Sequence, residues 1–515
     1  MKNYAILILT FLIGIFFSSK IVDRNYIFAV DGFIKLVQAK GLAGSGFASQ
    51  EIYYPGKKMD PEFHFHPLHT GSTLKLRKIH GEWYGPFPVA FSYLSAFALK
   101  FVSYKHLTYI SPLFVLLLLL LFYQQSQSLR ISLFLFFCTP FFLLSVDYSE
   151  YTAFAFLQYL GLFLFANVYS EGLPENTANP FPERSRMGIR KQGLVFLGGF
   201  LFASSIWFRL EVLLFFVCLF GVYFLIHRQD RAKVHAFAFF AIGSALGFVC
   251  FFIYNHITYE HFLGTRFLAN EKGFVVSLGE KLGNFLTLLF FYNKKPGFFF
   301  YVPVAGFLLY LFFQKQIRQQ VDSFVRILLW TSIAFILCVA ITAPNDGGLL
   351  NWASRYMILS FVPFALLLAD LYKRDVFSKK SYRWILRGLV SCSLVFNLLL
   401  FAILKTVSLG MKTANKDFLA TKADIWVFRS EDSAYLTGLE FFARDTYVLR
   451  KGDDVQEFVQ RLSATYSPKT RIAYVCNTNQ DAKGKEEVIS LLDKQLVKVG
   501  QKKSKFFVSE IYTLR

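Results

Sequence analysis

Asp31 stands directly after the first apolar segment of the chain, in the stretch IFAVDGFIKLVQAKGLAG from Ile27 to Gly44. The spacing of apolar residues predicts a short amphipathic helix over Gly32–Lys40, which Gly41 is expected to end. A carboxylate at the head of such a helix is suited to be its N-cap. The same position also suits a general base or a metal ligand that faces an aqueous cavity, because capping fixes the direction of the carboxylate.

A second pair of carboxylates, Asp147 and Glu150, follows another apolar segment in SVDYSEYTAF. Residues three positions apart lie on the same side of a helical turn. Two carboxylates at the mouth of a membrane span suit a metal ion or a hydroxyl group. The alternative is a solvated loop in which one of them caps a helix.

Arg209 and Glu211, in WFRLEVLLF, lie between two apolar segments with little room for a loop. This spacing predicts a tight hairpin at the membrane boundary, in which the two side chains form an ion pair. An arginine so placed is also suited to bind a phosphate group through two parallel hydrogen bonds. Both interpretations remain open at this point.

Arg355 follows a second turn, in NDGGLLNWASRYMILSFVPF, where Gly347 and Gly348 permit a tight change of direction. The pattern places Arg355 at the head of the next span, and Asp346 is a candidate ion-pair partner. A phosphate group at that helix start would meet both the guanidinium and the helix dipole. The alternative is an arginine that extends along the apolar surface to the lipid interface.

Three histidines in FHFHPLH, namely His64, His66 and His69, have a spacing that resembles a zinc site. No cysteine or second ligand motif accompanies them. Exposed or packed histidines in a long loop are the alternative.

The composition requires a membrane protein with many spans. Apolar residues make up 55% of the chain, the mean hydropathy is +0.42, and the apolar residues fall in repeated runs long enough to cross a bilayer. The sequence predicts an α-helical polytopic protein with 11 to 13 transmembrane helices. The net charge of +21 does not indicate a nucleic-acid partner, because the basic residues lie in short loops between apolar runs.

These basic loops predict the orientation of the chain, since cytoplasmic loops are rich in Lys and Arg. Alternation then places the candidate residues and the C-terminal tail outside the cytoplasm of a bacterial inner membrane. Three apolar runs separate two loops that both belong outside, so either one run is re-entrant or interfacial or the assignment of sides is wrong; Pro86–Ser103, which contains Lys100, is the weakest span. The basic loops are Ser170–Gly193, His227–His235, Gln314–Arg326 and Tyr372–Arg387.

Two domains are predicted: a transmembrane domain over residues 1–405, with a first external loop at about residues 20–85, and a small α/β domain over residues 412–515. In the tail, DIWVF, RIAYVCNT and KFFVSEIYTL have the pattern of strands. DDVQEFVQRLSAT and KEEVISLLDKQL have the periodicity of helices.

Taken in order, these segments resemble the GT-C superfamily of membrane glycosyltransferases, which includes protein mannosyltransferases and lipid A aminoarabinose transferases. The family pattern begins with one span and an external loop that opens with an acid and a helix, here Asp31 to Gly41. YGPFPVAFSYLSAF resembles the Pro-rich entry to the next run, WFRLE resembles the R-x-E hairpin, and NWASRYMILSFVP resembles the W…R-Y…P segment. The resemblance covers roughly residues 1–405.

The resemblance implies transfer of a sugar from a polyprenyl-phosphate donor to a lipid, glycan or protein acceptor on the outer face of the membrane, with inversion at the anomeric carbon. It implies that Asp31 is the base for the acceptor hydroxyl. Arg209 and Arg355, with Arg266 as a further candidate, would bind the lipid phosphate, and Asp147 and Glu150 would orient the acceptor or hold a divalent cation. A transporter of lipid-linked glycans and a non-catalytic membrane scaffold are the alternatives.

Overall fold

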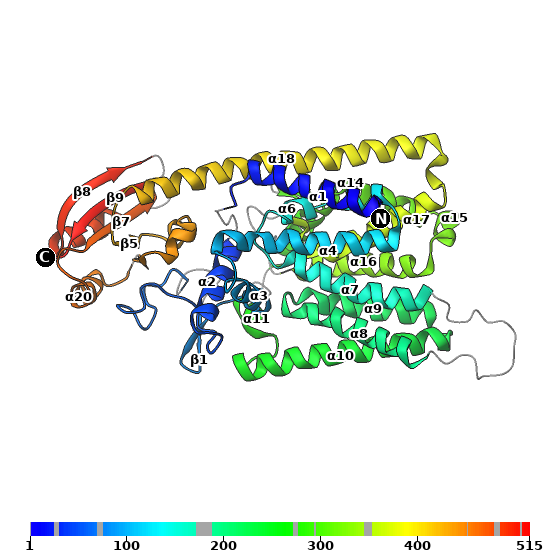
Figure 1. Ribbon diagram of the computed structural model, residues 1–515, viewed down its shortest axis with the longest axis horizontal. Coiled ribbons are helices and arrows are strands. Elements are labelled where there is room, and N and C mark those ends of the chain that lie inside the picture. Colours follow the sequence, from blue (N-terminus) through cyan, green and yellow to red (C-terminus); the bar gives the residue numbers. More distant parts are fainter. Residues whose placement is uncertain are drawn as a thin grey trace. The chain divides into compact units, whose positions relative to one another are not determined.

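The structure is a computed structural model, and it divides into two compact units (Figure 1). Unit 1 comprises Met1–Ile21, Pro88–Phe91 and Thr108–Ala402, and unit 2 comprises Val22–Phe87, Ser92–Leu107 and Ile403–Arg515. The first external loop therefore groups with the C-terminal segment, whereas the sequence assigned it to the transmembrane domain. The structure describes residues 2–24, 30–68, 76–170, 188–270, 277–292, 295–343, 353–450, 452–477, 485–504 and 507–515.

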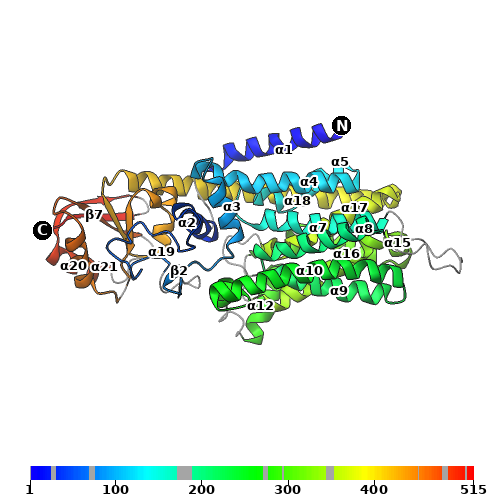
Figure 2. The same cartoon turned by 60° about the horizontal axis from the view of Figure 1, so that its bottom comes forward.

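Unit 1 is a bundle of helices, and Figures 1 and 2 show its long helices running side by side. Their bounds are α1 Lys2–Ile21, α4 Ile110–Ser126, α5 Leu129–Phe137, α6 Phe141–Leu144, α7 Tyr151–Ser170, α8 Ile189–Ser204, α9 Glu211–His227, α10 Arg231–Tyr259, α11 Gly264–Asn270, α12 Leu278–Leu289, α13 Phe298–Tyr301, α14 Pro303–Phe313, α15 Lys315–Gln320, α16 Ser323–Thr342 and α17 Phe361–Lys373. The 3-10 turns are η1 Tyr104–Tyr109, η3 Ser205–Trp207, η5 Ala353–Ser360 and η6 Val376–Ser378, and a short hairpin pairs β3 Phe291–Tyr292 with β4 Lys295–Pro296.

Seven helices among the described residues are long and apolar enough to cross a membrane, so the chain is an integral membrane protein. The helices α9 and α14 are apolar but shorter. The 11 to 13 spans expected from the sequence exceed the seven because several apolar runs are short or broken. The run Ile131–Ser145, for example, forms two short helices, α5 and α6, with Pro140 between them.

The run Pro86–Ser103, which the sequence marks as the weakest span, forms a short helix. Within Pro86–Ser103 the structure forms only α3 (Ala90–Ala98), a helix of nine residues. At 1.5 Å per residue such a helix is about 14 Å long, roughly half the thickness of the hydrocarbon core. Between this helix and Asp147, the helix of membrane-spanning length among the described residues is Tyr104–Ser126.

Glycines bring α7, α8 and α10 into close contact. A Cβ atom on Gly199 would lie 1.9 Å from the carbonyl oxygen of Phe240, and one on Gly161 would lie 2.4 Å from that of Gly198. The Oγ of Ser244 also donates a hydrogen bond of 3.0 Å to the oxygen of Gly199. Small residues with a bonded serine are the usual way to pack helices in lipid, where apolar side chains gain little by leaving the bilayer.

Unit 2 contains a five-stranded sheet in the order β6-β5-β7-β9-β8. The strands β6, β5 and β7 are parallel, and β9 runs antiparallel to both β7 and β8. The elements of the unit are α2 Val30–Gly44, β1 Arg77–Ile79, β2 Glu82–Tyr84, β5 Ile425–Phe428, α19 Glu431–Tyr435, η7 Gly438–Phe442, β6 Asp445–Val448, α20 Val455–Thr465, β7 Arg471–Asn477, α21 Lys485–Gln495, β8 Val497–Lys503 and β9 Phe507–Thr513. One continuous helix, α18 (Lys380–Leu419), belongs to unit 1 in its first part and to unit 2 in its last.

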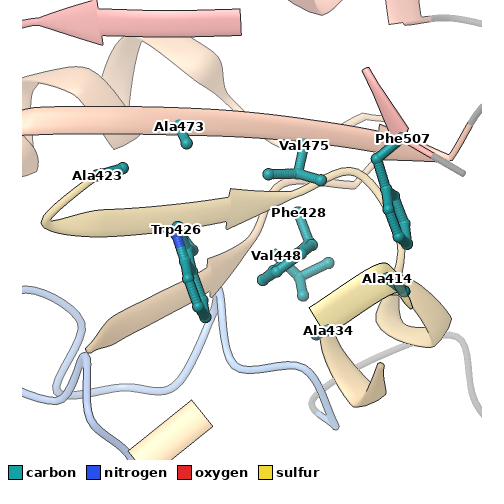
Figure 3. Close-up of a cluster of buried hydrophobic side chains, with 9 residues drawn as sticks. All are labelled: Ala414, Ala423, Trp426, Phe428, Ala434, Val448, Ala473, Val475 and Phe507. Atoms are coloured by element: carbon teal, nitrogen blue, oxygen red, sulfur yellow. The ribbon is translucent and has the colours of Figure 1, made fainter. Parts of the chain in front are cut away.

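The predicted α/β character of the tail is confirmed, since each of its five patterned segments forms the expected strand or helix. The side chains of Trp426 and Phe428 on β5 pack with Val475 on β7 and Val448 on β6 (Figure 3). The sequence did not reveal β8, which is a polar edge strand with lysines at Lys498, Lys502 and Lys503. Lysines on an exposed edge discourage pairing with another chain.

The other edge of the sheet, β6, is covered by the first loop. The backbone N–H of Val448 donates a hydrogen bond of 2.8 Å to the oxygen of Phe65. Arg450 follows β6 and donates to the backbone oxygens of His64 and His66. The first loop thus occupies hydrogen-bonding groups that an open edge strand would expose.

A buried polar group also belongs to this contact. The hydroxyl of Tyr54 donates to the carboxylate of Asp60 at 2.9 Å, and Asp60 is fully buried. Burial, together with the charge of Asp60, raises the pKa of Tyr54 well above its usual value. Lys58, in the same loop, lies 3.1 Å from Asp445 at the start of β6.

We expect Gly56→Ala to destabilise unit 2 by about 1–3 kcal/mol, the usual cost of overpacking. A Cβ atom on Gly56 would lie 2.3 Å from the ring of Tyr447. That ring has no room to move, because it is fully buried and its hydroxyl bonds to the Gly56 oxygen and to Tyr466. Thermal unfolding of the full chain in detergent measures the effect. Gly44→Ala is the control, since nothing lies within 4 Å of its new Cβ; equal melting of the two variants would contradict this contact.

Candidate functional site

A cluster of buried charges centres on Arg209, in the short link between η3 and α9. Its Nη1 donates a hydrogen bond of 2.9 Å to Oε1 of Glu150 and one of 2.8 Å to the hydroxyl of Tyr151, and both of these residues lie at the start of α7. Its Nε donates hydrogen bonds of 3.0 and 3.1 Å to the two carboxylate oxygens of Glu211, which is the first residue of α9. The predicted ion pair with Glu211 is therefore present, and Glu150 is a second partner that the sequence did not pair with it.

Burial makes this cluster energetically important. Only 6% of Arg209 and 2% of Glu150 is exposed. Burial opposes the charge of Arg209, but the carboxylates of Glu211 and Glu150 and the Tyr151 hydroxyl outweigh it and hold the pKa of the guanidinium above its usual value. Because two carboxylates share one arginine, Arg209 has its charge compensated without a ligand.

Arg355 joins the same cluster through two tyrosine rings. Its guanidinium carbon lies 5.8 Å from the ring centre of Tyr151 and 5.4 Å from that of Tyr356. The corresponding distances for Arg209 are 4.4 and 5.7 Å. Both arginines thus make cation–π contacts with the same pair of rings. The turn η5, which contains Arg355, packs against α7, α12, α13, α16 and α17.

Asp147 lies in the turn between α6 and α7 and is 8% exposed. A serine pair holds this turn: the Oγ of Ser111 on α4 donates to the backbone oxygen of Ser149 at 3.2 Å. The turn therefore places Asp147 and Glu150 together with Arg209 at one end of the bundle. No group of three or more His, Cys, Asp or Glu side chains in the described part of the chain is arranged to hold a metal ion.

Asp31 lies in unit 2, in the first turn of α2. The helix begins at Val30, so Asp31 is its second residue and not its cap, which corrects the expectation from the sequence. A carboxylate in the first turn is still stabilised by the helix dipole. Gly41 does not end the helix, which continues to Gly44. Its lack of a side chain instead admits the backbone oxygen of Glu51, which would lie 2.1 Å from a Cβ atom.

The helix that carries Asp31 is buried rather than half exposed, because residues 32–39 are all buried. The ring of Phe33 packs against Tyr435, Phe441 and Phe442 of the C-terminal segment, with ring centres 5.1 to 6.5 Å apart. Lys35 places its Nζ 4.4 Å from the ring centre of Phe87. The C-terminal segment thus provides part of the environment of the Asp31 helix.

The other candidate residues are not brought into one cluster. His64 is exposed, whereas His66 is buried and packs against the rings of Tyr54 and Phe63. Arg266 lies on α11, which packs against α10. His69 and Asp346 lie outside the described residues.

Tyr151 and Tyr356, whose rings both arginines contact, are not among the residues predicted from the sequence. A signal was available, since each tyrosine directly follows a residue that had been singled out, Glu150 or Arg355. Aromatic rings attract guanidinium groups, so a tyrosine that directly follows a candidate Glu or Arg at the end of a span is a candidate contact for an arginine.

Comparison with known proteins identifies the fold. No family model matches the chain, and no curated protein matches it. Two solved structures of ArnT from Cupriavidus metallidurans, one bound to undecaprenyl phosphate and one in the apo state, match with TM-scores of 0.55 and 0.56. Each is 11% identical to this chain, and each comparison covers 98% of this chain and 97% of ArnT.

A structure of the Archaeoglobus fulgidus oligosaccharyltransferase in complex with zinc and sulfate matches with a TM-score of 0.48 and 12% identity, over 97% of this chain and 72% of that one. The two ArnT structures show that this chain has the fold of ArnT, as the resemblance noted in the sequence predicted.

Proposed function

We propose that this protein transfers a sugar from a polyprenyl-phosphate donor to a lipid, glycan or protein acceptor at the outer face of a bacterial inner membrane. The observation that carries the proposal is the cluster of Arg209, Glu150, Glu211 and Arg355, of which Arg209 and Glu150 are buried, in a fold shared with ArnT. Charges buried at the ends of membrane helices are costly and mark functional sites. ArnT itself has been solved with undecaprenyl phosphate bound.

The reaction is one displacement at the anomeric carbon. The acceptor oxygen forms a bond to that carbon while the bond to the lipid phosphate breaks, and the phosphate keeps the electron pair. The configuration of the sugar inverts. The acceptor loses its proton to a base, for which Asp31 is the candidate, since a positioned carboxylate can act in this way.

The geometry favours different roles for the two arginines. Arg209 already donates to Glu150, Glu211 and Tyr151, so we assign it to holding those groups in place. Arg355 contacts the same two rings as Arg209, and we assign it to the charge that develops on the leaving phosphate, because a guanidinium placed beside a developing negative charge stabilises it. Asp147 and Glu150 would orient the acceptor, or Asp147 would contribute to binding a divalent cation.

Positive-inside topology supports the proposed side of the membrane. The ends of helices near the Arg209 cluster alternate with the basic loops His227–His235 and Tyr372–Arg387 along the chain. Those loops belong in the cytoplasm, so we place the Arg209 cluster and unit 2, with the C-terminal domain, on the outer side.

Arg355→Ala is expected to weaken binding of undecaprenyl phosphate by about tenfold to a hundredfold, the usual effect of losing a hydrogen bond to a charged group. Arg355→Lys is expected to restore only part of the affinity, because an ammonium cannot form the planar pair of bonds that a guanidinium makes. Titration of the purified protein with the lipid phosphate measures both. Arg318→Ala, which removes a cation from a basic loop, is the control. Wild-type affinity in Arg355→Ala would remove this residue as the phosphate ligand.

A further inference from the structure

Unit 1 contains a cavity at the end of α7 that is remote from Arg209. Its volume is about 830 Å³, and it lies between the last turns of α4, α7 and α17 and the first turns of α10 and α16. Since α7 has 20 residues, its two ends are about 30 Å apart. The cavity is therefore separate from the proposed transfer site and does not depend on that proposal.

Three cations line this cavity: Lys233 at the start of α10, and Lys373 and Arg374 at the end of α17. The two acidic residues of its lining accept hydrogen bonds from other residues of the lining. Asp322 accepts the backbone N–H groups of Phe324 and Val325 and so caps α16. The second acidic residue is Asp370, near the end of α17.

Asp370 accepts the backbone N–H of Asp322 at 2.9 Å and the Nε of Arg374 at 3.0 Å. These bonds fix the loop between the helices and use one of the five N–H groups of Arg374. Lys233 lies 3.3 Å from Asp230, in a half-buried ion pair at the start of α10. The lining carries three cations and two carboxylates, so the excess is one positive charge, and the carboxylates are oriented by their bonds to backbone N–H groups and to Arg374.

Neutral hydrogen-bonding groups complete the wall in fixed positions. The hydroxyl of Tyr169 lies 3.0 Å from Nε2 of His227 and 3.0 Å from Oγ of Ser323. The side-chain oxygen of Gln125 accepts a hydrogen bond from the Tyr159 hydroxyl at 2.5 Å. Groups held in this way keep their orientation when a ligand arrives, which lowers the entropic cost of binding.

We propose that this cavity binds the phosphate-bearing headgroup of an anionic membrane phospholipid. It opens among the ends of membrane-length helices, where lipid headgroups lie, and the loops around it are basic. Basic pockets between helices on the cytoplasmic side commonly receive anionic headgroups, and the lipids of that leaflet are negatively charged. The volume is many times that of one water molecule, so a headgroup with its glycerol is a reasonable occupant.

Titration of the purified full chain in detergent with dioctanoyl phosphatidylglycerol tests the proposal, with dioctanoyl phosphatidylcholine and inorganic phosphate as comparison ligands. Lipid binding is read by native mass spectrometry and by the rise in melting temperature. We expect phosphatidylglycerol to bind more tightly than phosphatidylcholine. The double variant Lys373→Gln/Arg374→Gln is expected to lose about tenfold or more in affinity, because it removes charge-assisted hydrogen bonds to the phosphate.

The matched control is Lys379→Gln/Lys380→Gln, which removes the same charge from the same loop but outside the lining of the cavity. It is expected to bind the lipid as the wild type does. Lys233→Gln, from a different wall, provides a second test if the double variant melts abnormally without lipid. An equal loss of affinity in the control would show general attraction to the basic loops and overturn the proposal. Equally tight binding of inorganic phosphate would also overturn it, in favour of a soluble phosphate ligand.

Discussion

Replacing Asp31 by Asn is expected to reduce sugar transfer by about 10²–10⁴-fold, the range by which a positioned general base accelerates a reaction. Asn has nearly the same shape as Asp but cannot accept the proton of the acceptor hydroxyl. The first turn of α2 and its buried neighbours should be undisturbed, because the exchange changes no packing volume. Membranes that contain each variant, supplied with labelled undecaprenyl-phosphate sugars, measure the transfer.

Asp23→Asn is the matched control for this experiment. Asp23 is an acid of the same loop, and its carboxylate lies 3.8 Å from the exposed Lys412. We expect transfer close to that of the wild type. Retention of full transfer by Asp31→Asn would remove Asp31 as the base, and equal losses in both variants would indicate a general effect of charge in the loop.

The second large effect is expected on stability. Arg209→Leu should destabilise the protein by about 3–5 kcal/mol, because removing one partner of a buried ion pair leaves the other charge uncompensated. Here Arg209→Leu leaves two carboxylates without their partner: Glu150, which is 2% exposed and bonded to Arg209 at 2.9 Å, and the less buried Glu211. Thermal unfolding in detergent, compared with the wild type, measures the loss.

A double variant separates this cause from loss of packing. Arg209→Leu/Glu150→Leu removes the arginine together with the more buried of its two carboxylate partners, so we expect it to be more stable than Arg209→Leu alone. Lys78→Ala is the surface control: Lys78 pairs with Glu62 at 2.6 Å, but both side chains are exposed, and such pairs contribute little. If the double variant is less stable than the single one, the ion pair is not what stabilises this end of the bundle.

Local sequence patterns predicted the elements well, because their causes are local. The spacing of residues predicted the helical and strand-like segments of the tail and the Arg209–Glu211 pair. The polar strand β8 was missed because its pairing with β9, rather than its own composition, makes it a strand.

Long-range relations were beyond the reach of sequence patterns. Nothing near Phe33 in the chain indicates that its ring packs against Phe441, some 400 residues away, or that Phe65 pairs with the edge of β6. Gly41 shows the same limit. It has the spacing of a helix stop, yet its role depends on the approach of the Glu51 backbone from a later segment. Such contacts decide which loop belongs with which domain.

Sugar transfer by the purified protein tests the central claim most directly. The full chain in liposomes, supplied with a panel of labelled undecaprenyl-phosphate hexoses and pentoses and with an extract of bacterial envelope lipids and glycans as acceptors, should release undecaprenyl phosphate as label appears in an acceptor. The anomeric configuration of the product, read by nuclear magnetic resonance, should be opposite to that of the donor. No transfer from any donor, or a product that keeps the configuration of the donor, would contradict the proposed reaction.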